Sequence, residues 1–163
     1  MFRSSADYTT GKMQKAIKEM ASYGSDMGGT NIHGALEALL KMPGHKTHTR
    51  NVFLLTDGAV GNPEGVIDLV KKNNHNVRFH AFGVGSGAST YLVKETAKAG
   101  FGTSHMVQDN DTTLNAKVIE SLSKACTPAF TGIEIDWGIP KEAILFQTPT
   151  TQYMDNVFEG ELF

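Results

Sequence analysis

The chain of 163 residues is long enough for one domain with a hydrophobic core, and its apolar and charged contents are close to average. Its formal charge of −2 gives no electrostatic reason to expect nucleic acid or an anionic membrane as a partner. The single cysteine excludes an internal disulfide and a cysteine-based zinc site. No apolar run approaches membrane-spanning length and the first residues lack a signal-peptide core, so we expect a cytoplasmic protein.

Two helices are predicted in the first quarter of the chain. Apolar residues between Gly11 and Tyr23 are spaced for one helical face. A tight glycine loop follows, and a second apolar face runs from Ile32 to Leu40. Thr30 or Asn31 stands where the N-cap of this second helix belongs.

The stretch RNVFLLTDGA at 50–59 organises the rest of the chain. The unbroken apolar run from Val52 to Leu55 is typical of a strand buried on both faces of a parallel sheet. Gly58 permits a sharp turn, so we expect Asp57 at the carboxyl end of the strand. Ligands of open α/β sheets bind at that end.

Helices and strands then alternate. We predict a helix from Pro63 to Asn73 capped by Asn62, a strand at Val77–Val84, a helix at Tyr91–Ala99, a short strand at Ser104–Val107 and a helix at Leu114–Cys126. The last helix gathers its apolar residues on one face, namely Val118, Ile119, Leu122, Ala125 and Cys126. This alternation predicts an α/β fold with a doubly wound, mostly parallel sheet.

The pattern changes after Pro128. Ile133–Trp137 alternates as a half-buried strand does, and Ala143–Phe146 and Val157–Phe163 resemble further short strands. We therefore place a boundary near Ala129, with residues 1–128 as the α/β domain and residues 129–163 as the start of a β-rich extension.

The strongest candidate site pairs the loop Gly28-Gly29-Thr30 with Thr56-Asp57-Gly58. Each loop places an oxygen-bearing side chain next to a strand end or a helix start, so the two can converge at one edge of the sheet. An oxygen-only set suits Mg²⁺ or Mn²⁺ rather than zinc. The alternative is that Thr30 is only an N-cap and Asp57 only a turn residue.

Other reactive residue types have simpler explanations. His45-x-x-His48 lies in a polar turn and is expected to be exposed, with a metal role as the alternative. His80 is expected to be a hydrogen-bonded residue inside the sheet, and Cys126 a packing residue. No nucleophile, base and oxyanion set can be assembled, so we expect no catalytic residue and no enzyme activity.

The ordered motifs resemble a known family. GGTNI before a helix, then NVFLLTDG, then FHAFGVG, resembles the von Willebrand factor A domain. YLVKETAKAGFGT and GIEIDWGIP are similar to the branch in which a VIT domain precedes the A domain, as in inter-alpha-trypsin-inhibitor heavy chains and their intracellular relatives. The resemblance covers nearly the whole chain.

The resemblance implies a metal-ion-dependent adhesion site at the carboxyl edge of the sheet. The family's second and third metal loops match Thr30 and Asp57, which leaves the first loop, D-x-S-x-S after the first strand, unmatched in this sequence. The family's first strand is central, so its loss predicts an N-terminally incomplete sheet with an open hydrophobic seam. Mg²⁺ would bind weakly unless that loop were supplied.

The resemblance also implies a function. We expect a non-enzymatic module that binds a protein partner through Gly29, Thr30, Asp57 and Gly58 with a partial metal site. The partner is expected to be the missing N-terminal part of its own domain, in a longer protein, or another subunit. The alternatives are a structural subunit of a large assembly without metal binding, or a non-catalytic segment of a larger enzyme such as a vault-type ADP-ribosyltransferase.

Overall fold

The computed structural model describes residues 6–24, 28–45, 47–75, 77–108, 110–130, 133, 135–147 and 157–158. Its helices are α1 (Thr10–Met20), α2 (Ile32–Leu40), α3 (Pro63–Asn73), α4 (Thr90–Ala99) and α5 (Leu114–Ala125), with a 3₁₀ turn η1 (Lys141–Ala143). Its strands are β1 (Arg50–Thr56), β2 (Val77–Val84), β3 (Ser104–Val107), β4 (Ala129–Phe130) and β5 (Val157–Phe158). None of the helices among these residues is long and apolar enough to cross a membrane.

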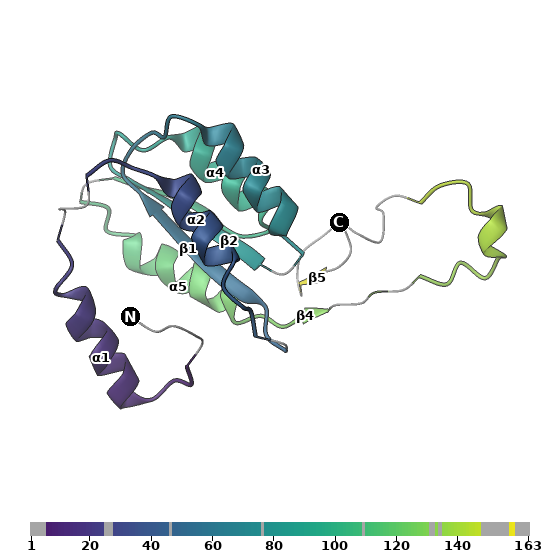
Figure 1. The fold of residues 1–163 in the computed structure, drawn as a ribbon, viewed down its shortest axis with the longest axis horizontal. Helices are drawn as coiled ribbons and strands as arrows, with labels where there is room; N and C mark the ends of the chain where they lie inside the picture. Colours follow the sequence, from purple (N-terminus) through teal and green to yellow (C-terminus); the bar gives the residue numbers. More distant parts are fainter. Residues whose placement is uncertain are drawn as a thin grey trace.

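Three parallel strands form the main sheet in the order β1-β2-β3. Helices α2, α3 and α4 cover one face, and α5 lies on the other (Figure 1). The α/β fold with helices on both faces of a parallel sheet confirms the sequence prediction. Each of the five helices and three strands predicted up to residue 126 is present within three residues of its expected bounds.

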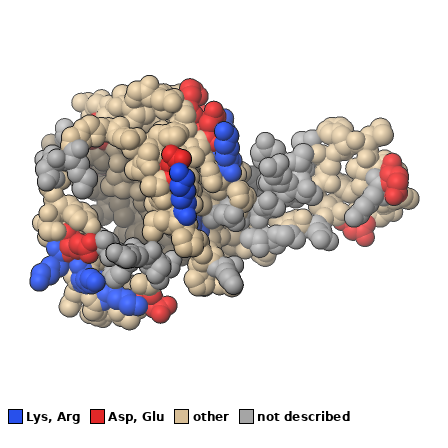
Figure 2. All heavy atoms as spheres, viewed as in Figure 1, with Lys and Arg blue, Asp and Glu red and all other residues tan. Residues whose placement is uncertain are grey.

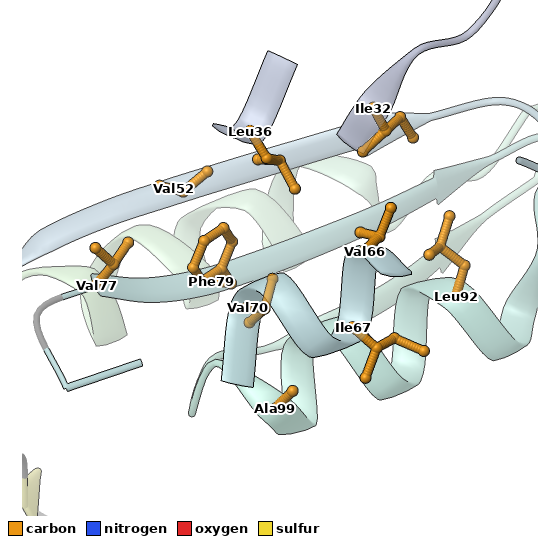
Figure 3. Close-up of a cluster of buried hydrophobic side chains, with 10 residues drawn as sticks. All are labelled: Ile32, Leu36, Val52, Val66, Ile67, Val70, Val77, Phe79, Leu92 and Ala99. Carbon is orange, nitrogen blue, oxygen red and sulfur yellow. The ribbon is translucent and has the colours of Figure 1, made fainter. Parts of the chain in front are cut away.

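The face under α2, α3 and α4 holds the apolar core. Phe79 on β2 is fully buried and belongs to one apolar cluster with Val66 and Val70 of α3 and Leu92 of α4 (Figure 3). Gly100 and Gly102 pass so close to Phe79 that a β-carbon on either would clash with it. Tight apolar packing of this kind is the main stabilising term of a small domain.

The opposite face is held to α5 by polar groups. His80 on β2 is buried and its Nδ1 lies 2.9 Å from the Thr103 hydroxyl, which in turn lies 2.6 Å from the hydroxyl of Ser121. Asn51 of β1 donates to the carbonyl of Ala125 at 3.1 Å, and the Arg78 guanidinium donates to the carbonyl of Lys124 at 2.9 Å. These bonds confirm His80 as a satisfied residue of the sheet.

Strand β1 lies at the edge of this sheet, which corrects the prediction that its apolar run is buried on both faces. Val52 is buried, whereas 67% of the Leu55 side chain surface is exposed. Leu55 pairs in register with Phe82 and so shares the α5 face with Phe53, which stacks on His80 at 4.8 Å between ring centroids. Among the described residues no strand pairs with the outer side of β1.

The buried face predicted for α5 is also wrong. Ser121 is the buried residue of this helix, whereas Val118, Ile119 and Leu122, which are expected to pack, are exposed, and Ala125 is half-buried. We call the exposed residues Leu114, Val118, Ile119 and Leu122 the α5 apolar face. Cys126, expected to pack, is an exposed free thiol. The polar side of the helix faces the sheet, because the Ser121 hydroxyl and the carbonyls of Lys124 and Ala125 form the hydrogen bonds to the sheet side.

Helix α1 stands apart from the sheet (Figure 1). Thr9 caps it by accepting from the Lys12 amide, yet the helix has no buried residue, so its predicted apolar face is not packed against the sheet. Met13, Ile17 and Met20 are exposed instead. Lys and Arg side chains gather over this end of the molecule on the face shown in Figure 2.

The region after Pro128 has less strand than predicted. Ile133 and 135–137 lie outside any strand, and Ala143 belongs to η1 with 144–146 irregular. Alternation alone does not make a strand when no neighbour pairs with it. Of Val157–Phe163, residues 157–158 form β5, which pairs antiparallel with β4, and 159–163 lie outside the described residues. The Arg78 guanidinium sits 3.8 Å from the Phe158 ring centroid, so β5 contacts the main sheet. The domain boundary near Ala129 stays a prediction.

Candidate functional site

The carboxyl ends of β1 and β2, with the loops that leave or approach them, form one edge of the sheet, which we call the carboxyl rim. Ile32, where α2 begins, lies toward this edge, whereas Val77, where β2 begins, lies at the other end (Figure 3). The loop before α2 carries Thr30, and Asp57 follows β1 directly. The two residues singled out from the sequence are therefore on loops at the same end of the sheet.

The N-cap of α2 is Asn31, whose side-chain oxygen accepts from the Gly34 amide at 2.9 Å. Thr30 is exposed and takes no part in this cap. The structure thus resolves the choice left open by the sequence, because the capping role falls to Asn31 and leaves the Thr30 hydroxyl available for another contact.

Asp57 is exposed in the bend after β1. The neighbouring Thr56 hydroxyl, not the Asp57 carboxylate, bonds within the turn by donating to the Gly58 carbonyl at 3.3 Å. Among the described residues, none forms a hydrogen bond or ion pair with the Asp57 carboxylate. A carboxylate in this position is open to an outside ligand.

Gly58 is not required by the backbone of this bend. Its φ lies outside the left-handed region and a β-carbon there would meet no atom within 4 Å. The prediction that Gly58 permits the turn through its special freedom is therefore wrong. The open space beside it does leave room for a partner to approach Asp57.

A third loop approaches the same place. Gly87, after β2, lies so close to the Asp57 carbonyl oxygen that a β-carbon would stand 2.9 Å from it. Gly85 in the same loop adopts φ +76°, which is a left-handed conformation suited to glycine. The sequence alone does not reveal this approach, because repeated glycines do not show which backbone they lie against.

Sequence reasoning missed a polar pair near this edge. The Tyr91 hydroxyl donates to Glu64 Oε1 at 2.6 Å, joining the first turns of α3 and α4. This bond, ahead of partial burial and the nearby negative charges, raises the pKa of the Tyr91 hydroxyl. The pair could have been predicted from the order of the elements, because helices that follow neighbouring parallel strands begin at the same end of the sheet.

The rim has the chemistry of a hard-cation site but few ligands. Among the described residues, no three His, Cys, Asp or Glu side chains gather to hold a metal ion. Thr30 and Asp57 offer one hydroxyl and one carboxylate, which fit Mg²⁺ in kind, while Mg²⁺ requires six oxygen ligands. Water or another polypeptide would have to supply the remainder.

Comparison with known proteins identifies one family, both by a family profile and by individual relatives. The von Willebrand factor type A domain profile matches residues 1–106. Human von Willebrand factor A domain-containing protein 5B1 is 30% identical over 161 residues, covering 99% of this chain and 13% of that protein. Human von Willebrand factor A domain-containing protein 5A is 31% identical over 139 residues, covering 85% of this chain and 18% of that protein. The chain thus spans less than a fifth of the length of both human relatives.

A solved structure shares the fold. The conserved hypothetical protein BatB from Bacteroides thetaiotaomicron superposes with a TM-score of 0.53 at 16% sequence identity. The match covers 69% of this chain and 68% of that protein. At this identity the likeness concerns the fold alone.

Proposed function

Since the chain belongs to the von Willebrand factor A domain family, whose members generally serve in protein interaction, we propose that it is a non-enzymatic module that binds a protein partner at the carboxyl rim. Gly29, Thr30, Asp57 and Gly58 are the proposed contact residues. The observation that carries the proposal is that Asn31 takes the capping role at α2, so that Thr30 and Asp57 offer free oxygen groups on the same edge of the sheet.

We further propose that Mg²⁺ takes part in this contact. The Asp57 carboxylate would bind the ion directly or through water, and the Thr30 hydroxyl would add a second oxygen. Two protein ligands leave most of the ion hydrated, so its affinity for this chain alone should be low. A carboxylate from the partner would complete the coordination and make recognition depend on the metal.

The proposal is tested by capturing partners from native extracts on the tagged chain, with Mg²⁺ or with a chelator. We expect Asp57→Ala and the chelator to remove the same proteins from the captured set. Asp68→Ala is the matched control, because Asp68 is an exposed carboxylate on α3 away from the rim. An identical set of proteins under all four conditions would contradict metal-dependent recognition.

A second candidate function rests on the open side of β1. Unpaired strand edges bind other strands, and none of the described strands pairs with the outer side of β1. Leu55 on this strand is exposed, and so is the α5 apolar face, so each offers hydrophobic surface to another polypeptide. The chain would then act as a structural subunit whose sheet is continued by another polypeptide, either elsewhere in its own protein or in a different one. Binding that persists in Asp57→Ala but is lost in Leu55→Lys would favour this role over the rim.

A further inference from the structure

The geometry points to a surface site for a divalent transition-metal ion of the Zn²⁺ and Cu²⁺ kind, formed by His45, Thr47 and His48. These residues lie in the turn between α2 and β1. Because β1 begins there, the turn is at the end of the strand opposite to Asp57. This turn uses different residues and a different class of metal from the carboxyl rim, so either site can be absent without the other.

Three potential ligand atoms converge in this turn. The Nδ1 atoms of His45 and His48 are 3.0 Å apart. The Thr47 hydroxyl oxygen lies 3.2 Å from the first and 3.0 Å from the second. The three atoms thus form a nearly equilateral triangle with all three side chains exposed to solvent.

The size of this triangle fits one face of a metal coordination sphere. Ligand atoms about 2.1 Å from a shared ion stand about 3.0 Å apart at right angles and about 3.4 Å apart in a tetrahedron. The observed separations of 3.0 to 3.2 Å fall between these values. An ion can therefore be placed over the triangle with small movements of the side chains.

The ligand types select the ion. Imidazole nitrogen suits Zn²⁺, Cu²⁺ and Ni²⁺, and Cu²⁺ binds such sites most tightly of the divalent series. Mg²⁺ prefers oxygen and should not compete. Two imidazoles and one hydroxyl leave positions for water, so the site is open rather than a closed structural centre.

The ends of the turn are fixed before any ion arrives. The Arg50 guanidinium donates to the Leu39 carbonyl at 3.0 Å and to the Met42 carbonyl at 2.8 Å. These bonds tie the start of β1 to the end of α2, and therefore limit how far the two histidines can separate. Holding ligands near their bound positions reduces the ordering cost of binding.

Without metal, the same contacts can act as hydrogen bonds. One Nδ1–H can donate to the other Nδ1, and the Thr47 amide donates to the Nδ1 of His45 at 3.3 Å. Metal binding requires both nitrogens to present lone pairs, so it replaces these bonds and competes with protons. Binding should consequently weaken on acidification.

The test is calorimetric titration of the full 163-residue chain with Zn²⁺ at neutral pH, repeated in the presence of excess Mg²⁺. We expect one equivalent to bind irrespective of Mg²⁺. Loss of a supporting residue around a metal typically costs 10- to 100-fold in affinity, so His45→Ala and His48→Ala should each lose at least about tenfold. His33→Ala, which removes an exposed histidine of α2, is the matched control and should bind as the unaltered chain does.

Electron paramagnetic resonance with one equivalent of Cu²⁺ provides a second readout that counts nitrogen ligands. Two coordinated imidazoles are expected in the unaltered chain and in His33→Ala, and one in each single variant of the turn. No Zn²⁺ binding above that of the double variant His45→Ala/His48→Ala, or a copper spectrum unchanged in that variant, would overturn the proposal and leave the turn as a hydrogen-bonded structure only.

Discussion

The two faces of the three-stranded sheet contact their helices in different ways. Under α2, α3 and α4 the contacts are apolar, and Phe79 and Leu92 have no exposed surface. Over α5 they are polar, because His80 reaches Ser121 through the hydroxyl of Thr103. Packing on the first face stabilises the fold. The hydrogen bonds on the second face mainly fix the orientation of α5, since each adds only about 1 kcal/mol net but requires a specific partner.

This difference explains why α5 is the less buried layer. An apolar helix face can slide and still be buried, whereas the carbonyls of Lys124 and Ala125 must meet Arg78 and Asn51. Meeting them orients the helix so that the α5 apolar face is turned to the solvent. A strand beside β1, or a helix beside α5, would cover the surface that this arrangement leaves open.

The largest expected effect comes from breaking the apolar face. Phe79→Ala removes a fully buried ring and should lower the free energy of unfolding by about 3–5 kcal/mol, measured by urea denaturation. Leu122→Ala truncates an apolar residue on α5 that is 49% exposed, and it should change stability by less than about 0.5 kcal/mol. Similar losses in the two variants would contradict the contrast between the faces.

Because His80 is buried on the polar face, we expect the free energy of unfolding to depend on pH. Burial, followed by the positive charges of Arg78, Lys124 and His105, lowers the pKa of His80 from 6.5 to about 4. Between these values the unfolded chain binds more protons than the folded one, so stability is complete above pH 6.5 and falls as the pH drops toward 4. The loss should approach about 3 kcal/mol for this group.

Chemical denaturation at pH 7 and pH 5 measures this loss. His80→Gln should reduce the difference between the two pH values, even though it also lowers stability at pH 7 by disturbing the bonds to Thr103 and Asn51. His33→Gln, at an exposed position of α2, should leave the difference unchanged. An equal pH dependence in all three proteins would place its origin elsewhere.

A smaller effect is expected where α5 meets the sheet. Ser121→Ala removes the 2.6 Å contact with the Thr103 hydroxyl but leaves Thr103 its contact with His80, so stability should fall by about 1 kcal/mol. The control is Ser123→Ala, an exposed serine on the same helix, which should be close to neutral. Thermal unfolding monitored by circular dichroism would compare the two, and an equal effect would argue against a buried polar attachment.

The sequence predicts the elements of this fold well and their burial less well. Periodicity and caps place β2 and α3 correctly, because the signals for both are local: an apolar run, and an Asn-Pro start. Burial depends on which elements lie next to one another. The apolar residues of α5 predict a packed face, yet that face is exposed because carbonyls near its C-terminus, paired with β1 and β2, set the orientation of the helix.

The candidate site is also predicted only in part from the sequence. The sequence correctly indicates that Thr30 and Asp57 lie on loops at one end of the sheet, since the carboxyl ends of parallel strands share an edge. It does not reveal that Asn31 rather than Thr30 caps α2, because both residue types are good caps. Nor does it reveal the triangle at His45 and His48, because the spacing of two histidines in a turn does not fix the direction of their rings.

The smallest effect on stability should come from the open side of β1, where neighbouring residues face opposite ways. Leu54 packs against the apolar core, whereas Leu55 is 67% exposed on the α5 face. Leu55→Lys should therefore change stability by less than about 0.5 kcal/mol. It should nonetheless reduce self-association of the chain, measured by analytical ultracentrifugation, because a charged side chain at a strand edge opposes pairing with another strand. Leu54→Lys is the contrasting variant, since it places a charge in the core and should destabilise the fold strongly. If Leu55→Lys were as destabilising as Leu54→Lys, the side chain of Leu55 would be packed, and β1 would not be an open edge.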